Sequence, residues 1–279
     1  MENKIFDWRR FGNVINHDIR NMWPTFGPTL LIIVLLPLLI WLGALVFGDI
    51  TTITIPTSIR LTVIALVISL AGIMAPSRLY RTANLPKKGI YFAMLPASKF
   101  EKYLSMLLMV MVVVPIAAIC GSLVLDTLLS ALPFGPYRDF LWASAPVWDW
   151  MSGNSYEDFE FYEIFFAKFT PMASIGGLVL SYINGTALFL FTSTLFKKHK
   201  VLYTILWLYL IEFVLTLIAT PIIITKMLAN DAMWITNYFD KFDPEQFVVA
   251  VYWIGNGIEF FFAALFIWWA GYRLRRMHY

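Results

Sequence analysis

Residues 98–125, SKFEKYLSMLLMVMVVVPIAAICGSLVL, join a polar helix start to a long apolar run. A helix needs about 20 mostly apolar residues to cross about 30 Å of hydrocarbon, and residues 103–125 satisfy this requirement. Ser98 and Glu101 have the spacing of a capping box, in which the hydroxyl accepts from the amide three residues on and the carboxylate accepts from the cap amide. The stretch therefore predicts a transmembrane helix with a sharp start at Ser98.

The same length criterion selects six apolar stretches. They are residues 26–47, 59–77, 103–125, 172–196, 201–224 and 247–271. Of the 279 residues, 59% are hydrophobic and 14% charged, whereas a soluble domain has about 45–50% apolar and about 25% charged residues. We predict an all-α polytopic membrane protein with one transmembrane domain over residues 1–279. Kinks are expected at Pro37, Pro115 and Pro221, and Cys120 is expected to be a buried structural residue.

Basic residues gather on one side of the predicted bundle, which sets its orientation. With the N-terminus in the cytoplasm, the cytoplasmic segments hold Lys4, Arg9, Arg10, Arg20, Arg78, Arg81, Lys87, Lys88, Lys99, Lys102, Lys197, Lys198, Lys200, Arg273, Arg275 and Arg276. Lys and Arg favour cytoplasmic loops, so we predict that both termini are cytoplasmic. Acidic residues concentrate in the predicted outer loops, 126–170 and 225–246. The net charge of +3 reflects this topology and gives no reason to expect nucleic-acid binding.

The N-terminal segment has apolar residues at helical spacing. They are Ile5, Trp8, Phe11, Ile15, Ile19 and Met22, with polar residues on the other faces. Such a helix lies along a membrane surface with its apolar face toward the lipid. We predict an interfacial helix over residues 1–25; the alternative is an ordinary amphipathic lead into the first span.

The predicted cytoplasmic segment 78–102 contains the short apolar run GIYFAML at 89–95. This run is too short to cross a membrane, so it has to pack on the bundle or on a partner protein. Pro96 disfavours helical geometry at Leu95, so one helix or turn ends there before the restart at Ser98.

The order of these elements resembles that of the permease subunits of type-2 ATP-binding-cassette exporters. Leu95, Pro96, Ala97, Ser98, Glu101 and Lys102 resemble a signature, L-P-A-S-x-x-E-K, of such permeases in Bacteroidetes-type bacteria. The resemblance implies an N-terminal elbow helix, six spans and a cytoplasmic coupling helix between spans two and three that inserts into a separate ATPase. The ATPase-coupling residues that it implies are Tyr91, Phe92, Leu95, Pro96, Ser98 and Glu101. The long outer loop 126–170 departs from the family pattern, so the cargo class stays open.

The same resemblance implies the partners and the location. An exporter of this class needs two copies of the ATPase subunit, and a second copy of this permease or a sister permease, in the bacterial cytoplasmic membrane. The sequence contains no G-x-x-x-x-G-K-[ST] loop, so ATP and Mg are expected on the ATPase rather than on this chain. We therefore expect that the chain is not an enzyme, that it holds no cofactor or metal, and that membrane lipid surrounds it.

Four polar residues within the spans are candidates for a translocation path: Asn184, Glu212, Asn256 and Glu259. A charge facing lipid costs at least about 2.5–3.5 kcal/mol, so both glutamates should face the bundle, a cavity or a partner chain. The alternative is that each group is protonated or hydrogen-bonded and merely joins helices, which is favoured for the asparagines. A stripe of small residues at four-residue spacing predicts a close packing face; it comprises Ala173, Gly177, Ser181 and Gly185.

Three functions remain open from sequence. The leading hypothesis is an exporter permease for an amphipathic or hydrophobic cargo. The second is a proton-coupled secondary transporter that uses Glu212 and Glu259, and the third is a non-transporting membrane scaffold or sensor. The histidines, His17, His199 and His278, are far apart in sequence and lack H-E-x-x-H spacing, which argues against a metalloprotease.

Overall fold

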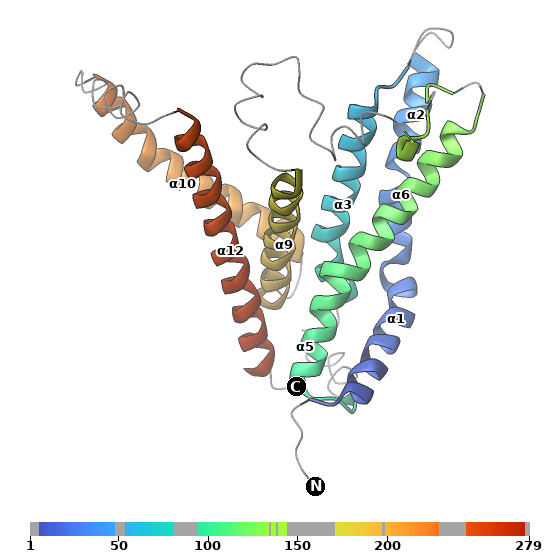
Figure 1. The fold of residues 1–279 in the computed structure, drawn as a ribbon. Coiled ribbons are helices and arrows are strands. Elements are labelled where there is room, and N and C mark those ends of the chain that lie inside the picture. The colour runs from blue at the N-terminus through green and yellow to red at the C-terminus, as the bar shows by residue number, and fades with distance from the viewer. Residues whose placement is uncertain are drawn as a thin grey trace.

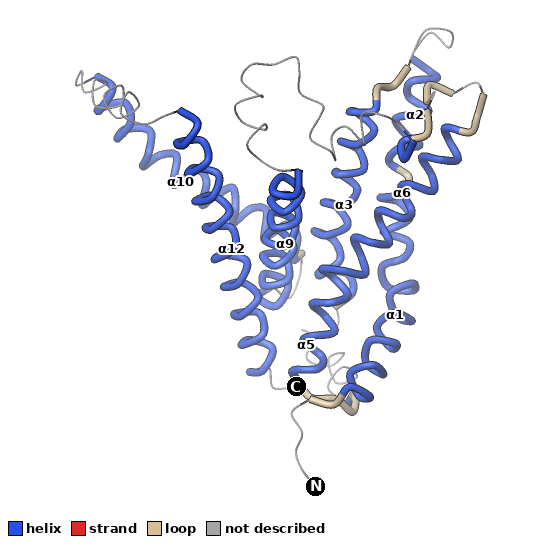
Figure 2. Tube along the Cα trace, viewed as in Figure 1, coloured by secondary structure: helices blue, strands red, loops and turns tan. Residues whose placement is uncertain are grey.

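The computed structural model describes residues 6–47, 54–80, 94–133, 135–137, 139–143, 171–196, 199–228 and 244–276 (Figure 1). Every regular element within these ranges is a helix (Figure 2). Six helical segments are long and apolar enough to cross a membrane. This confirms the predicted all-α class and the predicted number of spans.

The spans consist of one to three helical elements each. The first contains α1 (Trp8–Val34) and α2 (Leu36–Phe47), and the second is α3 (Thr57–Leu79). The third joins α5 (Lys99–Leu108), the π-helical turn η1 (Met109–Val113) and α6 (Val114–Ser130), and the short 3-10 helix η2 (Leu141–Ala143) follows it. The last three are α9 (Pro171–Leu195), α10 (Lys200–Leu228) and α12 (Pro244–Arg276).

The first helix corrects one of the predicted boundaries. We predicted that an interfacial helix ends at residue 25 and that the first span begins there, but α1 is continuous through this point and the break falls at Leu35. Pro24 and Pro28 lie inside α1, where each removes one backbone donor. Membrane helices tolerate this loss where neighbours pack around them, and Phe26 between the two prolines is fully buried in the core.

Breaks in the regular helix lie next to two of the three prolines at which we expected kinks. Pro37 is the second residue of α2, directly after the break, and Pro115 is the second residue of α6, directly after the π-helical turn. A π-turn and a proline both disturb the ladder of backbone hydrogen bonds, and the hydroxyl of Tyr182 in α9 donates to the Val110 carbonyl at 3.2 Å. Pro221 lies inside the unbroken helix α10.

The main core lies where α1, α3, the α5–α6 span and α9 meet. Its buried side chains include Phe26, Leu30, Val67, Ala71, Met106, Val110, Val114 and Leu190. Gly72 allows α9 to approach α3 closely, because an added Cβ would lie 2.6 Å from Thr186 Cγ2 and 2.8 Å from the Tyr182 ring. On its other side α9 packs along α12 (Figure 1).

Other surfaces are not covered within one chain. Most apolar side chains of α10 are exposed, among them Leu206, Trp207, Tyr209, Phe213, Leu215 and Leu217. Cys120, which we expected to be buried, is exposed on α6. Lipid or another chain has to cover these apolar surfaces in a membrane.

The predicted outer loops are only partly described. The helix α6 extends to Ser130, α10 extends to Leu228, and α12 begins at the predicted Pro244. Residues 144–170 and 229–243, which form the centres of these loops, lie outside the described residues.

Candidate functional site

The predicted capping box is present at the start of α5. The Glu101 amide donates to Ser98 Oγ at 3.1 Å, and the Ser98 amide donates to Glu101 Oε2 at 2.7 Å. Before it, the Ala97 amide donates to the Leu95 carbonyl at 2.7 Å, so the chain turns sharply around Pro96. The predicted sharp restart of the third span is confirmed.

Two predicted coupling residues, Tyr91 and Phe92, lie outside the described residues. The coupling helix itself therefore stays a prediction.

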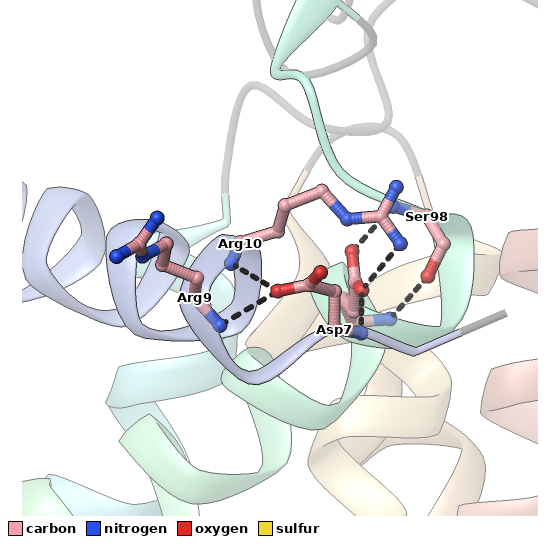
Figure 3. A network of polar contacts seen from close by, with 5 residues as sticks. Asp7, Arg9, Arg10 and Ser98 are labelled. Carbon is pink, nitrogen blue, oxygen red and sulfur yellow. Dashed lines mark hydrogen bonds and ion pairs between the residues drawn. The ribbon is translucent and has the colours of Figure 1, made fainter. Parts of the chain in front are cut away.

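The Glu101 carboxylate also binds the start of α1 (Figure 3). Its Oε1 accepts from the Asp7 amide at 2.7 Å and from Arg10 Nη2 at 3.2 Å. Asp7 in turn caps α1, because its Oδ1 accepts from the amides of Arg9 and Arg10 at 2.8 and 3.3 Å. Glu101 is 0% exposed, so these bonds replace water around its charge. We call Asp7, Arg10, Ser98 and Glu101 the α1–α5 joint.

A second buried carboxylate, Asp18, holds three helices together at the same end of the bundle. Its Oδ2 accepts from the Ser105 hydroxyl of α5 at 2.7 Å and from the Tyr80 hydroxyl, at the end of α3, at 3.2 Å. The ring of His17 lies beside it, with Nδ1 3.4 Å from Asp18 Oδ1. Burial, followed by the charge and the hydrogen bond of Asp18, raises the pKa of Tyr80 well above its usual value. Asp18 thus fixes α1 against both α3 and α5.

The sequence interpretation missed Asp18. We assigned Trp8 and Ile19 to the apolar face of the N-terminal helix, and both are exposed, whereas Phe11, Val14 and Asp18 face the bundle. A signal was available, because Asp18 follows Val14 by four residues and Phe11 by seven, which places all three on one helix face. The interfacial position of the exposed face stays a prediction.

Exposed apolar groups surround the α1–α5 joint. Met94 is 74% exposed and Trp8 is 78% exposed. The Phe6 ring lies 4.9 Å from the Trp8 ring and 6.3 Å from the Phe100 ring, measured between centroids. Pro96 is exposed beside them. This end of the molecule therefore presents an apolar surface on a firmly hydrogen-bonded base.

The opposite end of the bundle contains a buried ion pair that we did not predict. Arg60 Nε donates to Asp126 Oδ1 at 3.0 Å, and its Nη2 contacts the other oxygen of that carboxylate. The guanidinium also donates to Ser130 Oγ at 3.0 Å and to the Asp139 carbonyl at 2.8 Å, and lies 4.3 Å from the centre of the Tyr137 ring. Burial, aided by the Asp126 charge and opposed by Arg60, raises the pKa of Tyr137 to about 12. This network fastens the loop after α6 onto α3.

Two members of the predicted small-residue stripe of α9, Gly177 and Ser181, face α12. A Cβ added to Gly177 would lie 3.0 Å from the Tyr252 hydroxyl and 3.6 Å from Asn256 Oδ1. The Ser181 hydroxyl donates to Glu259 Oε2 at 2.7 Å. The prediction of a close packing face is confirmed at Gly177 and Ser181, whereas an added Cβ at Gly185 would meet nothing within 4 Å.

The four translocation candidates do not form one site. Asn184 lies on α9 one turn beyond Ser181, and its buried Oδ1 has no hydrogen-bond partner among the described residues. Asn256 and Glu259 lie on the facing side of α12. Glu212 is exposed on α10, and its carboxylate makes no hydrogen bond or ion pair with the described residues. The structure thus brings Asn184, Asn256 and Glu259 to one helix pair and leaves Glu212 apart.

Within the described ranges, no group of three His, Cys, Asp or Glu side chains could hold a metal ion. Comparison with family models, curated proteins and solved structures gives no match to this chain.

Proposed function

We propose that the chain is the membrane-spanning permease subunit of an ATP-driven exporter in a bacterial cytoplasmic membrane. A separate ATPase docks on the surface around residues 86–102, and ATP and Mg bind to that subunit. Six spans make half of the usual twelve, so a second copy of this chain or a sister permease completes the transporter.

The α1–α5 joint is the observation that supports this proposal most. A docking surface transmits force only if it is rigidly attached to the helices that it moves. The segment that ends in Ser98 is bonded directly to Glu101, and Glu101 is bonded to the start of α1 through Asp7 and Arg10. Displacement of the exposed turn at Met94 would therefore move the first and third spans together.

A proton-coupled secondary transporter is the alternative function. It is favoured by Glu259, a carboxylate near the middle of α12, hydrogen-bonded to Ser181. Glu212 lies apart from this pair, so a proton relay through Glu259 would have no second carboxylate beside it.

Co-purification from the native membrane tests the proposal. The full-length tagged chain is extracted in mild detergent, and bound ATPase subunits are identified by mass spectrometry. Met94→Asp places a charge on the exposed apolar turn at little cost in stability, because Met94 is exposed. We expect an ATPase with the native chain and little or none with Met94→Asp.

The matched control is Trp142→Asp, which places the same charge on an exposed apolar residue of the opposite end. This variant should retain the ATPase. Absence of an ATPase from the native preparation, or equal recovery with all three proteins, would contradict the proposal.

A further inference from the structure

The contact between α9 and α12 contains two acceptor oxygens that have no donor among the described residues, Glu259 Oε1 and Asn184 Oδ1. We call the residues Gly177, Ser181, Asn184, Asn256 and Glu259 the polar seam. Glu259 lies more than about 20 Å along the axis from either end of α12, at 1.5 Å per residue. Its Oε2 accepts from Ser181, while its Oε1 has no hydrogen-bond partner among the described residues. No Lys, Arg or His of the described chain forms an ion pair with it. An isolated carboxylate at this depth is unfavourable unless a cation or a proton neutralises it.

Asn184 adds a second acceptor on the same helix face. It follows Ser181 by three residues and Gly177 by seven, so all three point toward α12. Its Oδ1 is buried and has no donor within the described residues. A buried acceptor without a donor is costly, so Asn184 Oδ1 favours a ligand that brings an N–H or O–H group to it.

Aromatic rings continue the same surface of α12 beyond Glu259. Phe191 of α9 stacks on Phe266 and Trp269, with ring centroids 5.8 and 4.9 Å apart, and Phe262 stacks on Phe266 at 6.0 Å. Phe262 and Trp269 are both partly exposed. Aromatic faces attract cations and pack against apolar chains.

We propose that the polar seam binds the ammonium group of a hydrophobic primary amine, with the apolar part of the amine against the Phe262–Phe266–Trp269 rings. A primary ammonium supplies one positive charge and three N–H donors, which match Glu259 Oε1 and Asn184 Oδ1. A proton on Glu259 would supply a single O–H donor and remove the charge, whereas a primary ammonium supplies three N–H donors and leaves Glu259 ionised. A quaternary ammonium would supply the charge and no donor. The claim that this amine is the cargo rests on the proposed function, whereas its binding does not.

Equilibrium binding of a radiolabelled probe tests the proposal. Full-length protein in phosphatidylcholine nanodiscs is titrated at pH 7 with tritiated dodecylamine, and Glu259→Gln is compared with Glu212→Gln. Glutamine keeps an oxygen for Ser181 and removes the charge. We expect the affinity to fall at least about tenfold in Glu259→Gln, as for loss of one partner of a desolvated charge pair. It should be unchanged in Glu212→Gln, the same substitution on the exposed face of α10.

Competition experiments test the requirement for N–H donors. Unlabelled dodecylamine should displace the probe more strongly than dodecyltrimethylammonium, and dodecanol should not compete. Asn184→Leu should remove the preference for the primary amine, and it gives an independent test if Glu259→Gln does not fold.

Equal affinity of the native chain and Glu259→Gln would overturn the proposal, because binding would then be partitioning into the lipid. Equal displacement by the primary and quaternary amines in the native chain would also overturn it. Recovery of the ATPase from the native membrane is a separate measurement on a separate preparation. Failure of amine binding is therefore distinguishable from failure of the permease assignment.

Discussion

The buried carboxylates of the first three spans have several partners within the described chain, whereas the two glutamates near the middle of the last spans have one or none. Arg60 is bonded to Asp126, and Glu101 is bonded to Arg10. In the described part of α9, α10 and α12, Glu259 has one hydrogen bond and the carboxylate of Glu212 has none. The first three spans thus satisfy their buried carboxylates internally, while Glu212 and Glu259 leave carboxylate oxygens that a ligand, lipid or second chain can satisfy.

Removing one member of the buried ion pair should have the largest effect on stability. Asp126→Ala leaves the Arg60 guanidinium buried beside Tyr137 without its counter-ion, and loss of one partner of a buried pair costs about 3–5 kcal/mol. The free energy of unfolding is measured in mixed micelles by SDS titration with tryptophan fluorescence.

Glu212→Ala is the control for this prediction. It removes a carboxylate that makes no polar contact within the described chain, so it should change the free energy of unfolding by less than about 0.5 kcal/mol. Equal losses of unfolding free energy in Asp126→Ala and Glu212→Ala would contradict the difference in carboxylate pairing between the first three and the last three spans.

Crowding the contact between α3 of the first three spans and α9 of the last three should have the next largest effect on stability. Gly72→Ala brings a methyl group within 2.6 Å of Thr186 and 2.8 Å of Tyr182, and overpacking of this kind costs about 1–3 kcal/mol. Gly176→Ala, where an added Cβ meets nothing within 4 Å, should instead stabilise its helix by up to about 1 kcal/mol. Thermal unfolding of both variants measures the change in stability, which should be a loss in Gly72→Ala and a gain in Gly176→Ala. A change of the same sign in both variants would contradict the close approach of α9 to α3.

Loss of the cap on α5 should have a smaller effect. Ser98→Ala removes the acceptor of the Glu101 amide and should cost about 1 kcal/mol. Ser69→Ala is the control, because it removes an exposed hydroxyl that donates only to the Ala65 carbonyl of its own helix, and it should cost less than about 0.5 kcal/mol. A larger loss at Ser69 than at Ser98 would contradict the described cap.

The smallest effect should be confined to alkaline pH. The unfolded Tyr137 phenol loses its proton near pH 10, while the native pKa is about 12, mainly because of burial. Between these values the unfolded state binds fewer protons than the native state, so stability is intact below pH 10 and falls as the pH rises toward 12. Tyr137→Phe lacks this loss, so the stability difference between the native chain and this variant should change only in that window. Parallel pH profiles would contradict the buried position of the hydroxyl.

Local patterns predicted the spans and the start of α5. Six runs of sufficient length identify six spans, and the Ser98–Glu101 spacing identifies the capping box, because both depend on residues close in sequence. The contacts that position the candidate site are long-range. Asp7 and Glu101 are 94 residues apart, Arg60 and Asp126 are 66 apart, and Asp18 and Tyr80 are 62 apart. No local spacing encodes such pairs.

The boundary predicted at residue 25 was wrong because local and tertiary effects oppose each other there. Pro24 and the polar residues before it favour a break, but burial of Phe11, Val14 and Phe26 on one side of α1 keeps the helix continuous through this region. An amphipathic pattern alone does not distinguish a helix that packs on lipid from one that packs on its own bundle.

The α1–α5 joint also has a consequence for the order of assembly. The chain is synthesised from its N-terminus, so the Asp7 amide and the Arg10 guanidinium leave the ribosome long before Glu101 does. Contacts between residues so distant in sequence form late in folding. The joint therefore closes only after the first two spans and the first turn of α5 have been synthesised.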